Sequence, residues 1–188
     1  LKGIFPFKKF DDNKIALEGN NISLQSKALK VDSAAKSKSA ELPQYIYYTD
    51  NLKLLELNTK TLEKNLIDER VISFNVSPNN KQIIFNKDDD IILYNIPNKK
   101  KMKIDTGAFP VWIDNNQIIF IKTYDNGHDI VTSDIYLKNV NNSLAAANIT
   151  DTLGELEYEP CYDFQSGRVY YSSLRDGNIK YFKLNIKK

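Results

Sequence analysis

The sequence predicts an all-β fold built from repeated short antiparallel strands. Three observations lead to this prediction. Short apolar segments alternate with polar turns along most of the chain, the same strand–turn–strand pattern recurs, and the 11 Tyr and 9 Phe residues far outnumber the single Trp. Aromatic residues favour strands, and short strands at regular spacing are typical of all-β folds.

The recurring segment is a hairpin of two apolar strands around a polar turn. Five copies follow one another, at residues 14–26, 45–58, 83–96, 118–140 and 169–185. Equivalent positions lie 31, 37, 35 and 51 residues apart, and the last interval is the longest because it contains an extended hairpin and linker. In the fifth copy, Asp-Gly and Gly-Asn within Arg175-Asp176-Gly177-Asn178 supply the positive-φ positions of a tight hairpin. We therefore interpret this segment as a turn and not as a catalytic pair.

Further strands extend the hairpins into larger units. Four hairpins have an additional strand and polar turn before them, in the segments 4–17, 72–85, 108–120 and 158–171. Pro6, Pro110 and Pro160 fall where this strand begins, a position at which a sheet tolerates a residue without a backbone donor. A strand is also expected after three hairpins, at 62–66, 101–104 and 147–150. Four strands in about 40 residues is the repeat of a β-propeller blade.

Helix signals are weak by comparison. Residues 33–42 are rich in Ala, Ser and Lys and fit a turn of helix or a flexible loop. Residues 61–70 place Leu62 and Leu66 at helical spacing, but a short strand fits the repeat better. We predict one β-propeller domain over residues 1–188, with about five four-stranded antiparallel blades. The expected units are approximately 4–34, 43–66, 71–104, 107–151 and 156–186.

The two ends of the chain predict a ring that is incomplete or open. Lys188 follows soon after the third strand of the last unit, and only Leu1, Lys2 and Gly3 precede the first. Either the last blade is short, or part of the ring lies before Leu1. A leader or anchor before Leu1 is a further alternative.

Composition argues against several function classes. The net charge of +2 gives no electrostatic case for binding nucleic acid, and no apolar run reaches the roughly 18 residues of a membrane helix, so any membrane contact is expected to be peripheral. The single cysteine, Cys161, excludes an internal disulfide, and we expect it to be a buried small apolar residue. No cofactor is predicted.

The turns predict two sides of opposite charge. The hairpin turns hold eight acids against three bases, and the remaining turns hold eight bases, Lys101 and Lys138 among them, against three acids. Faces of opposite charge would steer charged partners toward one side. The alternative is that the charges only reflect the general polarity of turns. The candidate binding residues in the hairpin turns are Asp88, Asp89, Asp90, Tyr124, Asp125, Asn126, His128, Arg175 and Asp176. The basic run Lys99, Lys100 and Lys101 fits a solvated loop or a contact with anionic lipid or acidic protein.

Catalytic and metal chemistry find little support in the sequence. His128 is the only histidine and is expected to be an exposed loop residue. One His and one Cys fall short of the three or four nitrogen or sulfur ligands of a typical zinc site, so none is predicted. Adjacent Asp residues at 88–90 point in alternating directions and rarely converge on a cation. The acids that could act as a glycosidase pair are Asp114, Glu157, Glu159 and Asp163. We expect Asp114 and Asp163 to bond to the backbone of their own turns instead.

Four short motifs of these repeats are similar to those of a known repeat. Ser77-Pro78-Asn79-Asn80 looks like its first turn, Asp134-Ile135-Tyr136 like its Ile-Tyr strand, and Ile149-Thr150 like its Leu-Thr element. Residues 172–178 are similar to its Ser-Asp-Arg-Asp-Gly-Asn turn. With these motifs, the chain resembles the TolB-type, WD-repeat-like propellers. The resemblance implies a non-catalytic scaffold of the periplasm or cell envelope that binds envelope proteins through its loops or channel mouth. The alternative is a propeller-based enzyme of the glycosidase kind, or the gating domain of a hydrolase.

Overall fold

The computed structural model describes residues 43–152 and 154–184, which form fourteen β-strands and no helix. None of these residues belongs to a helix that could cross a membrane. The strands are β1 (Tyr45–Asp50), β2 (Lys53–Asn58), β3 (Lys64–Glu69), β4 (Val71–Val76), β5 (Gln82–Lys87), β6 (Asp90–Asn95), β7 (Lys100–Thr106), β8 (Ala108–Trp112), β9 (Gln117–Asp125), β10 (Ile130–Asn139), β11 (Ala147–Asn148), β12 (Glu157–Asp163), β13 (Arg168–Ser173) and β14 (Ile179–Lys183).

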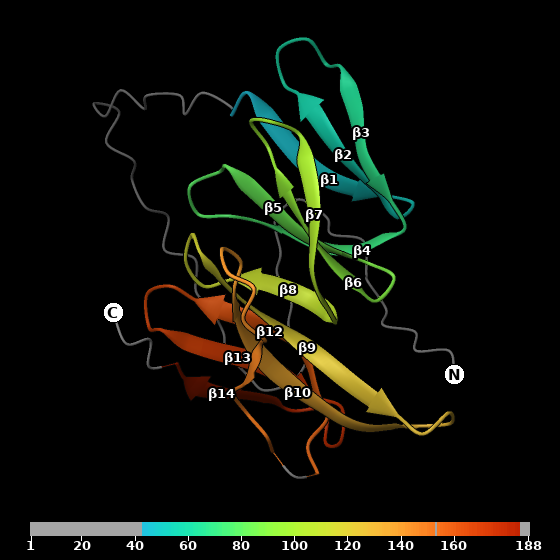
Figure 1. The fold of residues 1–188 in the computed structure, drawn as a ribbon, viewed down its shortest axis with the longest axis vertical. Helices are drawn as coiled ribbons and strands as arrows, with labels where there is room; N and C mark the ends of the chain where they lie inside the picture. Colours follow the sequence, from blue (N-terminus) through green and yellow to red (C-terminus); the bar gives the residue numbers. More distant parts are fainter. Residues whose placement is uncertain (1–42, 153, 185–188) are drawn as a thin grey trace, which may run out of the picture. The chain divides into compact units, whose positions relative to one another are not determined.

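The strands form four antiparallel meanders in chain order (Figure 1). The first sheet contains β1–β3, the second β4–β7, the third β8–β11 and the fourth β12–β14. The predicted all-β, blade-like architecture is confirmed, and so is the strand over 61–70, because β3 lies there. The predicted unit 4–34 and the segment 33–42 lie outside the described residues, so the fifth blade and the single domain over 1–188 stay predictions.

The first strand of each of the last three sheets carries an irregularity near its start. The pairing register shifts between Val71 and Ser73 in β4, between Ala108 and Val111 in β8, and between Tyr158 and Cys161 in β12. Pro110 and Pro160 occupy two of these bulges, where no ladder hydrogen bond needs their missing donor. The sequence predicted that these prolines stand where the strands begin. In the structure they stand at bulges just inside the strands.

A separate apolar core fills each of the three junctions between consecutive sheets. Successive residues of β5 serve two of them: Ile83 and Phe85 belong to the core shared with the first sheet, and Ile84 to the core shared with the third. In β9, Phe120 and Ile121 likewise belong to different cores. Side chains of a strand alternate between its faces, so a strand between two sheets can carry apolar residues at successive positions. This explains the unbroken apolar runs of the sequence.

Backbone hydrogen bonds define two sides of the described sheets. On the first side, which we call the hairpin-turn side, each linker between sheets contacts a hairpin turn. Val71 N donates to Leu52 O (2.8 Å), and Gly107 N donates to Asp89 O (2.8 Å). On the second, the opposite side, the remaining turns contact one another, as in Val140 N to Asn116 O (2.8 Å). The hairpin-turn side carries most of the predicted binding residues.

Candidate functional site on the hairpin-turn side

The hairpin of β9 and β10 is the longest, with strands of nine and ten residues. Its tip is held by side-chain caps. Asp125 Oδ1 accepts a hydrogen bond from Gly127 N (2.9 Å), and Asn126 Oδ1 accepts from His128 N (3.0 Å) and Asp129 N (2.9 Å). Asp125 and Asn126 thus shape the turn, and His128 is exposed there as predicted.

Apolar side chains lie in solvent beside this tip. Tyr124 is 66% exposed, and Ile130 and Val131 are each 41% exposed. Aromatic and aliphatic residues at a protruding tip are typical of protein-binding surfaces. The sequence pattern pointed to Tyr124 but not to Ile130 and Val131. The only signal for them was the unusual length of the fourth hairpin.

The three aspartates of the β5–β6 turn have separate partners. Asp88, whose φ is 52°, pairs with Arg70 Nη1 (2.9 Å), and Asp90 pairs with Lys103 Nζ (2.6 Å). Asp89 accepts the linker hydrogen bond described above through its carbonyl oxygen. Both ion pairs are exposed and contribute at most about 1 kcal/mol each. The three carboxylates therefore do not act as one group.

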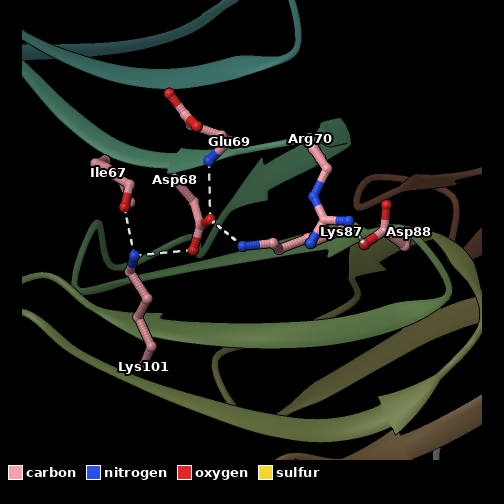
Figure 2. Close-up of polar contacts among 7 residues, drawn as sticks. All are labelled: Ile67, Asp68, Glu69, Arg70, Lys87, Asp88 and Lys101. Carbon is pink, nitrogen blue, oxygen red and sulfur yellow. Dashed lines mark hydrogen bonds and ion pairs between the residues drawn. The ribbon is translucent and has the colours of Figure 1, made fainter.

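Asp68, at the end of β3, binds two lysines of the second sheet (Figure 2). Its Oδ1 accepts from Lys87 Nζ (2.7 Å) and from Glu69 N (2.8 Å), and its Oδ2 accepts from Lys101 Nζ (2.8 Å). Lys101 Nζ also donates to the Ile67 carbonyl oxygen. Burial alone would raise the pKa of the Asp68 carboxyl, but the hydrogen bonds from Lys101 and Lys87 outweigh it and hold this pKa below its usual value.

The same arrangement recurs one junction later. Asp105, near the end of β7, accepts from Lys122 Nζ (2.7 Å) and from Thr106 N (2.9 Å), and Lys138 Nζ lies 3.6 Å from its second oxygen. Burial again opposes ionisation, and the hydrogen bond from Lys122 again leaves the pKa of Asp105 lowered. These two carboxylates tie consecutive sheets together across the linkers.

The third junction uses a different group, for which the sequence predicted only a possible role as a catalytic acid. Glu157 is fully buried at the start of β12. Its Oε2 accepts from Thr150 Oγ1 (2.6 Å) and Ile135 N (2.9 Å), and its Oε1 accepts from Thr152 Oγ1 (3.1 Å). Burial raises the pKa of Glu157, and the hydrogen bonds from Thr150, Thr152 and Ile135 N offset this only in part. The donors are all neutral.

The Arg175–Asn178 segment is a turn held by its own polar groups. Asp176 Oδ1 accepts from Asn178 N (3.0 Å), and Gly177 has a φ of 70°. The hydrogen bond from Asn178 N lowers the pKa of Asp176 to about 2. Asp176 pairs with Lys180 Nζ (3.2 Å), which also binds Glu155 Oε1 (2.8 Å). Arg175 contributes to none of the ion pairs within 43–152 and 154–184.

The predicted separation of charge needs correction at two lysines. Lys101 and Lys138 were counted with the basic turns, but their ammonium groups pair with Asp68 and Asp105. These aspartates lie at the ends of β3 and β7, beside the linkers that contact the hairpin turns, and so fall outside a count made by turn. Of the run Lys99–Lys101, Lys101 is ion-paired, whereas Lys99 and Lys100 have no ion pair among the described residues. Lys99 lies in an exposed turn and has a φ of 56°.

The remaining candidate residues are scattered. Asp114 Oδ1 accepts from Asn116 N (2.6 Å), and Asp163 Oδ1 accepts from Gln165 N (2.9 Å), so both bond to their own turns as predicted. Cys161 is exposed, which corrects the expectation of a buried residue: it lies just after the β12 bulge, on a face outside the three apolar cores. No cluster of three metal-ligating side chains occurs in the part of the chain that the structure describes.

Four successive antiparallel meanders, joined by short linkers and packed through apolar junctions, define a β-propeller fold. No protein-family model matches the chain, and no curated protein matches its sequence. Solved propeller structures do match. The structure of putative TolB from Agrobacterium tumefaciens has a TM-score of 0.55 at 13% identity, and covers 73% of this chain and 60% of its own.

Two further matches are enzymes by their descriptions. Oligogalacturonate lyase from Vibrio parahaemolyticus has a TM-score of 0.54 at 11% identity, over 73% of this chain and 48% of its own. The tricorn protease has a TM-score of 0.50 at 18% identity, over 69% of this chain and 14% of its own. The chain thus spans less than two thirds of each of these structures, and at such identities the likeness shows the fold alone.

Proposed function

We propose that the chain is a non-catalytic scaffold that binds a protein partner through its hairpin-turn side. One observation carries this proposal. The β9–β10 tip holds Tyr124, Ile130 and Val131 in solvent, and the capped turn between them has a defined shape. Asp125 and Asp129 stand beside these apolar groups, so the complementary surface would be apolar with a basic margin.

The cell envelope is the proposed location, and an envelope protein the proposed partner. The resemblance of the repeats to TolB-type propellers and the similar fold of the Agrobacterium protein support this. The alternative, a propeller-based enzyme or the gating domain of a hydrolase, draws on the likeness in fold to a lyase and a protease. Propellers carry many functions, so the site must decide between them.

Affinity capture from the native host tests the scaffold proposal. The bait is the 188-residue chain, and the test variant combines Tyr124→Ser with Ile130→Ser at the tip. The control is Leu62→Ser, because Leu62 is 71% exposed in a turn of the opposite side. We expect wild type and control to recover the same envelope protein, and the tip variant to recover at least about tenfold less, because truncated anchors remove about 1–2 kcal/mol or more of binding.

Two results would overturn the proposal. One is that wild type recovers no envelope protein at all. The other is that the tip variant and the control recover equal amounts, because the partner would then bind elsewhere. Circular dichroism of both variants checks that the sheets are intact.

A further inference from the structure

A cleft of about 920 Å³ lies between the second and third sheets, away from the β9–β10 tip. One wall is β7 with its neighbours β5 and β6, and the other is the segment 140–143 that follows β10. Ligand sites in proteins commonly have volumes of about 300–1,000 Å³. The cleft is therefore large enough for several residues of an extended peptide.

Strand register arranges the first wall in two rows. Gln82 pairs with Asn95, which pairs with Lys100, so these three side chains share one face of the sheet. Two positions further along the strands, Leu93 and Met102 form an apolar row on the same face. Met102 is 54% exposed, a large apolar side chain left in solvent at the cleft. The wall thus offers a polar row beside an apolar one.

One unpaired positive charge faces the cleft. Lys100, Lys101, Lys103 and Lys138 all contribute to its lining, and no Asp or Glu does. Lys101 and Lys103 lie on the other face of β7 and pair with Asp68 and Asp90, and Lys138 pairs with Asp105, whereas Lys100 has no ion pair among the described residues. Its ammonium group is exposed and available to an anionic ligand.

We propose that this cleft binds an extended acidic segment of a partner protein. Apolar side chains of the segment pack on Leu93 and Met102, and its carboxylates approach Lys100. The amides of Asn95 and Asn141, both in the lining, can donate to and accept from a peptide backbone. β7 is the outermost strand of its sheet, so an extended chain has a free strand edge beside it.

Other anions fit the cleft less well. Bases of single-stranded nucleic acid stack on aromatic side chains, and none lines this cleft. An anionic membrane would meet several exposed lysines on a projecting surface, whereas here one unpaired lysine, Lys100, borders a hollow with an apolar wall. The proposal does not depend on the β9–β10 tip, so it can fail while the scaffold proposal stands, or the reverse.

Selection from a display library of random decapeptides on the immobilised 188-residue chain tests the inference. We expect the selected peptides to combine acidic with apolar residues. Their affinity should fall about fivefold or more in Lys100→Glu, because an attraction becomes a repulsion, and should weaken with added salt. Lys60→Glu is the matched control, because Lys60 is also exposed in a turn of the opposite side but does not line the cleft.

A second variant, Met102→Ser, separates the apolar contact from charge and should also weaken the selected peptides. The inference is overturned if no peptide is selected, if the selected peptides are not acidic, or if Lys60→Glu weakens them as much as Lys100→Glu. A membrane would be the ligand instead if no peptide binds, the chain binds vesicles containing phosphatidylserine, and Lys100→Glu abolishes that vesicle binding. The Tyr124→Ser variant should leave peptide affinity unchanged.

Discussion

The junction between the second and third sheets and the junction between the third and fourth solve one problem in different ways. Both place a carboxylate between sheets, next to the linker. Asp105 is matched by the ammonium groups of Lys122 and Lys138, whereas Glu157 is matched by two hydroxyls and one backbone N–H. The first junction repeats the arrangement of Asp68 with Lys87 and Lys101.

The third–fourth junction thus keeps an acid–donor contact but reverses its direction: the acid lies in the first strand of the following sheet, and its donors come from the preceding sheet and the linker. Where lysines donate, the pKa of the acid falls, and where neutral groups donate to a fully buried acid, burial dominates and the pKa rises. The two junctions should therefore respond in opposite directions to pH, and unequally to mutation.

The largest effect is expected at Gly107, in the linker that follows Asp105. Its φ is 146°, and a Cβ there would lie 2.4 Å from Ile121 O and 2.7 Å from Phe120 Cδ2. Gly107→Ala should reduce the free energy of unfolding by about 3 kcal/mol or more, because steric overlap with backbone adds to conformational strain. Urea unfolding measures the loss.

Gly177→Ala is the matched control for this change. Gly177 also has a positive φ, of 70°, but no atom lies within 4 Å of the Cβ that it would acquire. Only the backbone strain remains, so the expected loss is about 1 kcal/mol. Equal losses at Gly107 and Gly177 would show that the second–third linker is not packed as tightly as described.

A smaller effect is expected from removing the carboxylates of the lysine-matched junctions. Asp105→Ala leaves the ammonium group of Lys138, whose side chain is 7% exposed, without its counter-charge, and should cost about 3 kcal/mol at most. Asp68→Ala frees Lys87 and Lys101, which are 30% and 40% exposed and can be hydrated, so about 1 kcal/mol is expected. An equal loss in the two variants would contradict the role assigned to burial of Lys138.

The strands were predictable because local pattern determines them. The continuous apolar runs at 83–85 and 118–121 indicate strands buried on both faces, and Asp-Gly and Asn-rich segments indicate the turns between them. Even Pro110 and Pro160 marked the correct part of β8 and β12, although the exact feature is a bulge. Each of these signals depends on residues close in sequence.

The junction contacts were not predictable for the complementary reason. Asp68 and Lys101 are separated by 33 residues, and Glu157 and Ile135 by 22, so only the packing of one sheet on the next brings them together. Side-chain direction also mattered: Lys100 and Lys101 are adjacent in sequence but point to opposite faces of β7, one toward the cleft and one toward Asp68. A count of charges by turn could not distinguish them.

The smallest effect, and the most direct test of the comparison, is expected from Glu157→Gln. The amide can keep one oxygen for Thr150 and Ile135 N and can donate to Thr152, so the free energy of unfolding should change by about 1 kcal/mol or less. Its dependence on pH is the informative quantity, because glutamine does not ionise.

The sign follows from the direction of each pKa shift. The folded pKa of Glu157 lies above its usual 4.5, so wild type loses stability as pH rises from 4.5 through the folded pKa, and Glu157→Gln should become relatively more stable over that same interval. The folded pKa of Asp105 lies below its usual 3.8, so the loss caused by Asp105→Asn should be constant above that value and shrink as pH falls through the folded pKa. Urea unfolding of both variants, from acidic pH below 3.8 to neutral pH, measures the two slopes. Parallel curves for the two variants would mean that the two carboxylates are in the same electrostatic environment, and that the neutral donors of the third–fourth junction stabilise an ionised Glu157 as well as lysines stabilise Asp105.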